Sequence, residues 1–381
     1  MKDILFIAII STLVSCNPSS SSKSEVATGV DDILDQFEYQ LQKDIEDDNL
    51  NGSISLAIVK GDKVLRSKAF GEADLNHHAA DTSTIYRIGS VTKSFTSLLM
   101  MQLAQEGIIQ IGDPIEKYLP EIRGLVGYSD STKITFGQLA SHTSGLHSGP
   151  NYGKPANATV KEWESLLLKC IPATSFGSRP GRRYSYSNIG FAILGLALSR
   201  AADKPYMELI QTRIFNPLHM SNSFFLVPEE RQSDLAQGRW GPMGEVDDVR
   251  PQEDHTNIGW SVANGGIFST SNDLTKFMFS MMGYSDILND DYLEMMQTTQ
   301  TPEGKWNENY GYGVAIYQDS IISTIGHQGG NPGYRANFLF EKETKYGVIL
   351  LRNYSWGITD LNLRSTVLLR KLNEFEVKSK F

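Results

Sequence analysis

The feature that most constrains the fold of this 381-residue chain is that its strand-like segments lie at both ends of the sequence. Short apolar runs typical of strands occur at residues 53–59 and 64–70, and again at 311–317, 336–340 and 346–351. The long middle part of the chain carries helix-like apolar spacing and loops. Because the sheet is completed only when the chain returns from this middle part, we expect an α+β fold. It should have a mainly antiparallel sheet flanked by helices, with an inserted, mostly helical region.

Helices are predicted next to both groups of strands. Apolar residues in segments 30–48 and 358–375 recur every three or four positions, with charged residues between them. The run that begins at Thr92 is apolar enough to predict a buried helix, with Ser90 at its start.

The N-terminus predicts export. The apolar run at residues 4–14 is too short to span a bilayer as a settled helix, but it suits the core of a signal peptide. The run ends at a Leu-Val-Ser-Cys sequence that resembles the bacterial lipoprotein processing box, so we expect a signal peptide at 1–15 and a lipid on Cys16. Ordinary secretion with an incidental Cys16 is the alternative. The serine-rich residues 16–28 are expected to form a flexible tether.

Composition narrows the class of protein further. Cys170 is the only cysteine besides Cys16, so no disulfide framework is expected and stability must come from the hydrophobic core. The formal net charge of −9 argues against a nucleic-acid partner.

Ser90 and Lys93 are the first residues with a chemical signal. Residues three apart on a helix share a face, with Cβ atoms about 5–6 Å apart. A serine hydroxyl is a poor nucleophile unless a nearby base takes its proton, and Lys93 is within reach of that role. The S-x-x-K pattern alone is weak, because it often arises by chance at helix starts.

Two further motifs follow in order: Tyr186-Ser187-Asn188, and His327-Gln328-Gly329 within a glycine-rich segment. With these motifs the chain resembles the serine β-lactamase and penicillin-binding-protein superfamily. The similarity is to the branch of class C β-lactamases, D-alanyl-D-alanine carboxypeptidases and related esterases. It runs from about residue 51 to 372 and includes the segments 139–146 and 259–270.

The resemblance implies one catalytic domain at residues 29–381 with a β-lactamase/transpeptidase-like fold. Its sheet part would cover about 29–88 and 305–381, its helical part about 89–304, and the active site would lie in the cleft between them.

The resemblance also implies the catalytic roles. Ser90 would attack a carbonyl to form an acyl-enzyme, and Tyr186 would pass the proton to the leaving group. Whether Lys93 or Tyr186 is the general base stays open, because the reference pKa values of both groups, about 10.4 and about 10, lie far above neutrality. Asn188 would hydrogen-bond a substrate amide and Lys93; the alternative is that Ser187 and Asn188 only cap a helix.

His327, Gly329 and Gly330 would form the opposite wall of the cleft, on an edge strand that lies close to the substrate. The backbone N–H groups of Ser90 and Gly330 would form the oxyanion hole. β-Lactamases of this branch usually carry lysine where His327 stands. With an ordinary pKa of about 6.5, His327 would be only partly charged and would hold a substrate carboxylate less firmly, which puts efficient β-lactam hydrolysis in doubt. Arg335 could serve a carboxylate instead, or be a surface residue.

Two histidine pairs invite a metal interpretation, His77 with His78 and His142 with His147, but neither has a metalloenzyme motif around it. We therefore expect no metal and no cofactor, and expect His142 to pack a loop near the cleft.

The sequence as a whole thus predicts a serine hydrolase that acts through an acyl-enzyme, first of all on D-alanyl-D-alanine-type peptides. The alternatives are an esterase or β-lactamase of the same family, or a non-catalytic penicillin-binding or sensor protein. The expected partner is a small molecule or peptide with an acyl group. The expected location is the cell envelope, with a lipid anchor as the sole attachment to a bacterial membrane. The oligomeric state is not indicated.

Overall fold

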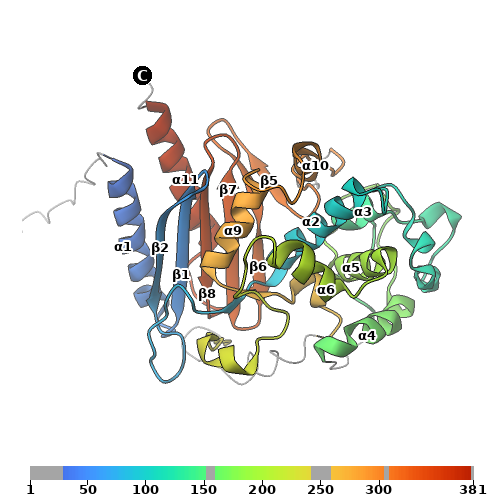
Figure 1. Cartoon of the computed structure of the whole chain (residues 1–381), viewed down its shortest axis with the longest axis horizontal. Helices are drawn as coiled ribbons and strands as arrows, with labels where there is room; N and C mark the ends of the chain where they lie inside the picture. The colour runs from blue at the N-terminus through green and yellow to red at the C-terminus, as the bar shows by residue number, and fades with distance from the viewer. Residues whose placement is uncertain (1–28, 152–158, 242–258, 304–308, 379–381) are drawn as a thin grey trace, which may run out of the picture.

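Six antiparallel strands form the sheet of this computed structural model, which describes residues 29–151, 159–241, 259–303 and 309–378. Their order across the sheet is β2-β1-β8-β7-β6-β5. The strands are β1 (Ser53–Lys60), β2 (Lys63–Gly71), β5 (Ala315–Gln318), β6 (Ser323–Asn331), β7 (Tyr334–Glu341) and β8 (Tyr346–Arg352). The N-terminal β1 pairs along its length with the C-terminal β8, as the colours of Figure 1 show. This confirms that the sheet is completed only when the chain returns.

Helices cover both faces of the sheet because its strands alternate apolar side chains between two cores. Ile54, Leu56 and Ile58 pack with α1 (Val30–Asp48) and α11 (Leu361–Lys378) on one face. Ala57 and Val59 face the larger core on the other side. There α9 (Ser271–Met281) lies against the sheet (Figure 1).

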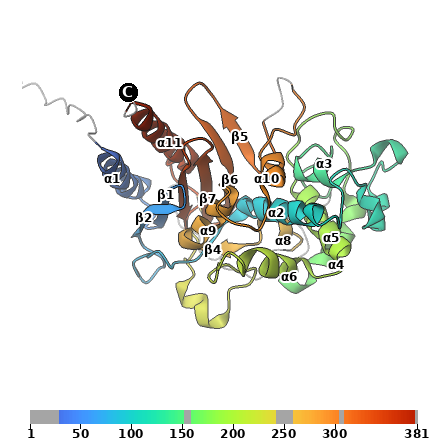
Figure 2. The same cartoon turned by 45° about the horizontal axis from the view of Figure 1, so that its top comes forward.

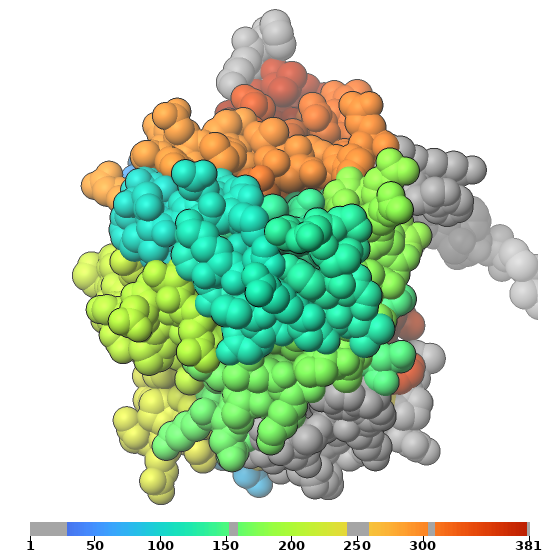
Figure 3. Space-filling view, turned by 90° about the vertical axis from the view of Figure 1, so that its right-hand side faces the viewer, coloured from blue at the N-terminus to red at the C-terminus, as the bar shows by residue number. Residues whose placement is uncertain are grey.

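The larger core extends into the inserted helical region. This region contains α2 (Thr92–Gln105), α3 (Phe136–Ala140), α4 (Trp163–Cys170), α5 (Asn188–Ala202), α6 (Tyr206–Ile210), α8 (Val262–Gly265) and α10 (Asp290–Met296). A two-stranded sheet, β3 (Tyr86–Arg87) with β4 (Phe268–Ser269), lies where it joins the main sheet. Figure 2 shows α2 running from the sheet into the group of α3, α5 and α8. Every residue of α2 from Thr92 to Ala104 is buried, as predicted for this segment. The middle of the chain forms most of the face in Figure 3.

The strand expected at residues 311–317 begins only at Ala315. Gly313 has a φ of +70°, and a Cβ added to it would lie 2.7 Å from the carbonyl oxygen of Lys93. Because this backbone passes directly against α2, the residues before Ala315 turn instead of extending.

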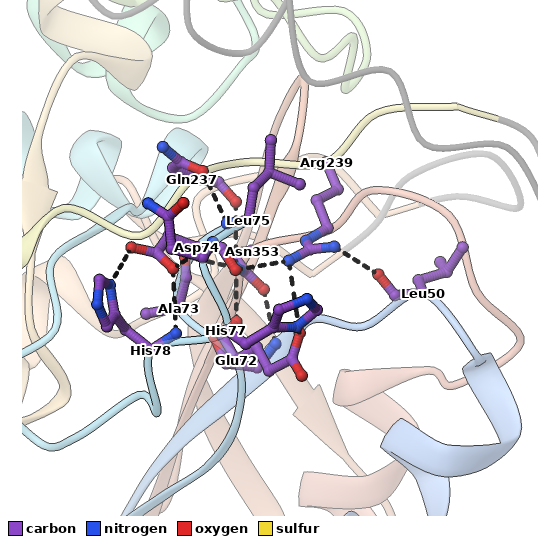
Figure 4. A network of polar contacts seen from close by, with 12 residues as sticks. Leu50, Glu72, Ala73, Asp74, Leu75, His77, His78, Gln237, Arg239 and Asn353 are labelled. Carbon is purple, nitrogen blue, oxygen red and sulfur yellow. Dashed lines mark hydrogen bonds and ion pairs between the residues drawn. The ribbon is translucent and has the colours of Figure 1, made fainter.

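The side chain of Asn353, directly after β8, hydrogen-bonds four backbone groups (Figure 4). Its side-chain oxygen accepts from the Ser53 N–H at 2.7 Å. Its side-chain nitrogen lies 3.1 Å from each of the carbonyl oxygens of Glu72, Ala73 and Gln237. The side chain is fully buried, so these groups have no easy replacement by water.

Replacing Asn353 by alanine is therefore expected to lower the free energy of unfolding by about 2–4 kcal/mol, because it leaves buried donors and acceptors unpaired. Urea unfolding followed by circular dichroism measures this. Asn76→Ala, at an exposed position in the nearby loop, is the control and should change stability by less than about 0.5 kcal/mol. Equal effects of the two substitutions would contradict the role of Asn353.

Within the ranges described above, no helix has both the length and the apolar character needed to cross a bilayer. The predicted signal peptide at residues 1–15, Cys16 and the tether at 16–28 lie outside the described residues. Their processing and lipidation stay predictions.

Candidate active site

Ser90 and Lys93 meet where the chain enters α2. Ser90 lies in the 3₁₀ turn Gly89–Val91, and Lys93 lies in the first turn of the helix. The Lys93 Nζ is 2.9 Å from the Ser90 Oγ and donates to the carbonyl oxygen of Asn264 at 2.8 Å. Lys93 is fully buried, and this burial lowers its pKa well below the usual lysine value. A neutral amine has a lone pair that can accept the serine proton, which is what a general base requires.

Tyr186 hydrogen-bonds the same hydroxyl. The Lys93 Nζ is 4.9 Å from the centre of the Tyr186 ring. Burial raises the pKa of Tyr186 to about 12, although a hydrogen bond with Ser90 partly offsets the rise. Tyr186 is therefore a protonated phenol at neutral pH and can donate a proton. The structure thus brings together Ser90, Lys93 and Tyr186.

Glycines let β6 approach the Ser90 turn closely. A Cβ added to Gly329 would lie 1.9 Å from the carbonyl oxygen of Ile88. A Cβ added to Gly89, which has a φ of +52°, would lie 2.6 Å from the backbone nitrogen of Gly330. The backbone nitrogen of Gly330 therefore lies beside the turn that carries Ser90.

The expectation that this strand is the edge of the sheet is wrong, since β6 lies between β5 and β7. However, β5 pairs only with Ser323–Gly326, whereas β7 pairs with β6 as far as Asn331. The half of β6 that starts at His327 therefore extends beyond β5, and no other strand of the described residues pairs with that side.

His327 is neutral, and this corrects the expected partial positive charge. Its Nδ1 lies 2.6 Å from the carbonyl oxygen of Gln328, so Nδ1 carries the hydrogen and donates it. The Nε2, 2.8 Å from the Tyr310 hydroxyl, then accepts a hydrogen bond from it. Burial is the main cause that lowers the pKa of His327 to about 3. At ordinary pH His327 supplies no cation to a substrate carboxylate.

Asn188 is the first residue of α5, and the preceding Ser187 caps that helix by accepting from the Gly190 N–H at 3.1 Å. The side chain of Asn188 lies 3.5 Å from the side-chain nitrogen of Asn264. Lys93 donates to the Asn264 backbone rather than to Asn188, so the hydrogen bond expected between Lys93 and Asn188 is not made in the described part of the chain. Asn188 borders the site, half-buried.

His142 is fully buried against Tyr186, with ring centres 4.2 Å apart. Its Nδ1 accepts from the N–H of Ser187 at 3.0 Å, which anchors the chain next to Tyr186. Burial lowers its pKa well below the usual value, so this ring is neutral as well. The prediction that it packs a loop near the cleft is confirmed.

Sequence reasoning missed two residues of the site, Asn264 and Tyr310. Asn264 lies inside the segment 259–270 that carried part of the resemblance, but its contribution is a backbone carbonyl that no side-chain pattern reveals. Tyr310 is one of 16 tyrosines, and nothing in the sequence distinguishes it.

The histidine pairs do not assemble a metal site among the described residues, where no cluster of three metal-binding side chains occurs. His77 and His78 instead pair separately with Glu72 and Asp74 at the surface (Figure 4).

The sequence profile of the beta-lactamase family matches residues 41–369. Beta-lactamase-like protein 4 of Dictyostelium discoideum is 29% identical over 339 residues, which cover 83% of this chain and 59% of that protein. Protein flp of Staphylococcus aureus (strain N315) is 25% identical over 327 residues, covering 84% and 64%. The chain thus spans about three-fifths of the length of these curated relatives.

Solved structures show the same fold. The octameric penicillin-binding protein homologue from Pyrococcus abyssi matches with a TM-score of 0.74 and 25% identity, over 91% of this chain and 77% of that one. The beta-lactamase/D-alanine carboxypeptidase from Yersinia pestis, complexed with citrate, matches with a TM-score of 0.72 and 24% identity, over 91% and 98%. Because it is only 24% identical, the Yersinia pestis structure shows a similarity of fold alone.

Proposed function

The chain belongs to the beta-lactamase family, and from this premise we propose that it is a serine hydrolase acting through an acyl-enzyme on Ser90. One observation carries the proposal. The Ser90 hydroxyl lies 2.9 Å from a fully buried Lys93 amine whose pKa is lowered by that burial. A binding protein has no need of a desolvated base beside a serine.

The proposed reaction starts with Lys93 as the base. Its neutral amine takes the Ser90 proton while the Ser90 oxygen attacks the substrate carbonyl, and the N–H groups of Ser90 and Gly330 stabilise the resulting oxyanion. Tyr186, still a phenol because of its raised pKa, gives its proton to the leaving group. The Lys93 ammonium then returns a proton to Tyr186. Water releases the acyl group from Ser90 by the reverse set of transfers.

Two substrate classes follow from different observations. Membership of the family supports D-alanyl-D-alanine-type peptides, whose terminal carboxylate would need a positive partner. The neutral state of His327 favours the second candidate, esters or amides without that carboxylate. A β-lactam carboxylate would meet the same neutral histidine.

Labelling tests the acyl-enzyme. Wild-type protein treated with a fluorescent penicillin or a nitrophenyl ester is expected to carry one acyl group on the peptide that contains Ser90, found by mass spectrometry, and Ser90→Ala should carry none. A long-lived penicillin label would support a penicillin-binding peptidase, and a rapidly lost label a β-lactamase. Ester turnover without a penicillin label would support an esterase. If no acyl donor labels the protein or is turned over, the proposal is wrong.

The pH profile tests Lys93 as the base. Below the pKa of Lys93 the amine is protonated and cannot accept the serine proton, so kcat/KM should fall about tenfold per pH unit on the acid side. On the alkaline side no loss from Tyr186 is expected below about pH 11, because its pKa is about 12.

His327→Asn is the control for the histidine. It should keep the fall of kcat/KM on the acid side, since burial lowers the pKa of His327 to about 3. A fall that disappears in this variant would assign the titration to His327 instead.

A further inference from the structure

A pocket of about 660 Å³ opens beside Tyr186 and His327, within the range of small-molecule sites. Three tyrosines, Tyr184, Tyr186 and Tyr310, line one side of it. The other lining residues belong to β5, β6, β7 and the start of α11, from Asp360 to Thr366. Tyr186 borders this pocket and also hydrogen-bonds Ser90, so one phenol connects the pocket with the reacting hydroxyl.

The charge of the pocket is unusual for a site that would bind a carboxylate. Among the described residues that line it, Asp360 alone carries a formal charge at neutral pH, since His327 is neutral. The N-terminus of α11 offers little attraction for an anion. Asp360 already accepts from the N–H groups of Asn362 and Leu363 there, at 2.9 and 3.0 Å.

Arg335 is not among the residues that line this pocket. It lines an adjoining hollow that shares Gln328, Asp360 and Asn362 with the pocket. Its Nη1 donates to the carbonyl oxygens of Tyr334 at 2.9 Å and Asn331 at 3.2 Å. At the rim, next to the exposed polar residues Gln328 and Asp360, Leu363 and Tyr317 are 58% and 51% exposed, so each has free surface for a ligand.

We propose that this pocket receives the leaving group of the substrate, and that this leaving group is apolar and carries no carboxylate, such as an aryl or branched alkyl alcohol. The inference rests on the proposed function, in which Tyr186 protonates the leaving group and therefore faces it. The acyl C–O bond breaks, and the departing oxygen takes the Tyr186 proton inside the pocket. The aromatic walls and the exposed Leu363 at the rim favour such a group, and Asp360 disfavours an anion.

Two aryl esters of acetyl-D-alanine test the proposal, one with a meta-carboxamide on the phenyl ring and one with a meta-carboxylate. Wild-type protein should hydrolyse the neutral ester with a kcat/KM at least about tenfold higher. Leu363→Arg adds a cation at the exposed rim and should reduce this ratio at least about fivefold. The neutral control Leu363→Gln should leave it unchanged. The methyl ester, whose leaving group is too small to reach the rim, should be hydrolysed equally by all three proteins. Equal or faster hydrolysis of the carboxylate ester by wild type would overturn the proposal.

Binding to Ser90→Ala separates the two possible failures. Calorimetry with the free phenols, meta-hydroxybenzamide and meta-hydroxybenzoate, should show tighter binding of the neutral one. If no ester is hydrolysed and no acyl donor, penicillin included, labels Ser90, the proposed function fails and the leaving-group assignment fails with it, whichever phenol binds. If penicillin labels Ser90 but no ester is hydrolysed, the function stands and the leaving-group assignment is wrong. If esters are hydrolysed but the benzoate binds as tightly as the benzamide, the function stands and the inference about the pocket is wrong.

Discussion

Ser90→Ala, Lys93→Met and the double variant are each expected to lower kcat/KM by about 10⁴- to 10⁶-fold, with the double variant no slower than the slower single one. The reason is that Ser90 and Lys93, 2.9 Å apart, act as one unit: without the base the hydroxyl keeps its proton, and without the hydroxyl the base has no task. Steady-state kinetics with a nitrophenyl ester measure the three losses.

The variants of Ser90 and Lys93 must be shown to fold, so that the loss of activity is not a loss of structure. Lys93 is fully buried, and replacing a desolvated amine with an apolar side chain of similar length should leave the melting temperature unchanged or raise it. Lys204→Met, at a side chain that is 57% exposed, is the matched control and should keep full activity. Two losses that multiply in the double variant would show that Ser90 and Lys93 act independently, which contradicts the mechanism.

Gly89→Ala is expected to lower kcat/KM by about 10²- to 10³-fold, the typical effect of losing an oxyanion donor. The new Cβ would lie 2.6 Å from the Gly330 nitrogen, so β6 must shift away from the Ser90 turn. The φ of +52° adds a strain of about 1–3 kcal/mol to the folded state.

Gly107→Ala separates strain from displacement. Gly107 has a φ of +73°, but a Cβ added there meets nothing within 4 Å. It should lose stability as Gly89→Ala does and keep its activity, with thermal unfolding and kinetics measured on the same samples. If Gly107→Ala loses as much activity as Gly89→Ala, the loss reflects strain, and the placement of Gly330 is not what matters.

Local periodicity predicted much of the fold because it records which side of an element faces a core. The alternation of residues 53–59 and 346–351 identified strands that pair as β1 and β8, although they are nearly 300 positions apart. The same reasoning misplaced the start of β5. The chain turns at Gly313 because α2 passes close to it, and the residues next to Gly313 in the sequence do not reveal that contact.

The sequence by itself determined which chemical groups are present and in what order: a serine and a lysine three apart, a tyrosine before a helix, and glycines in a strand near the end. Only the tertiary structure decided the protonation states and the hydrogen-bond partners of these groups. Lys93 loses its contact with water and donates to Asn264, 171 positions away, while His327 becomes neutral through burial beside Tyr310. Protonation depends on desolvation and on partners brought from distant parts of the chain, and neither is encoded in the spacing of nearby residues.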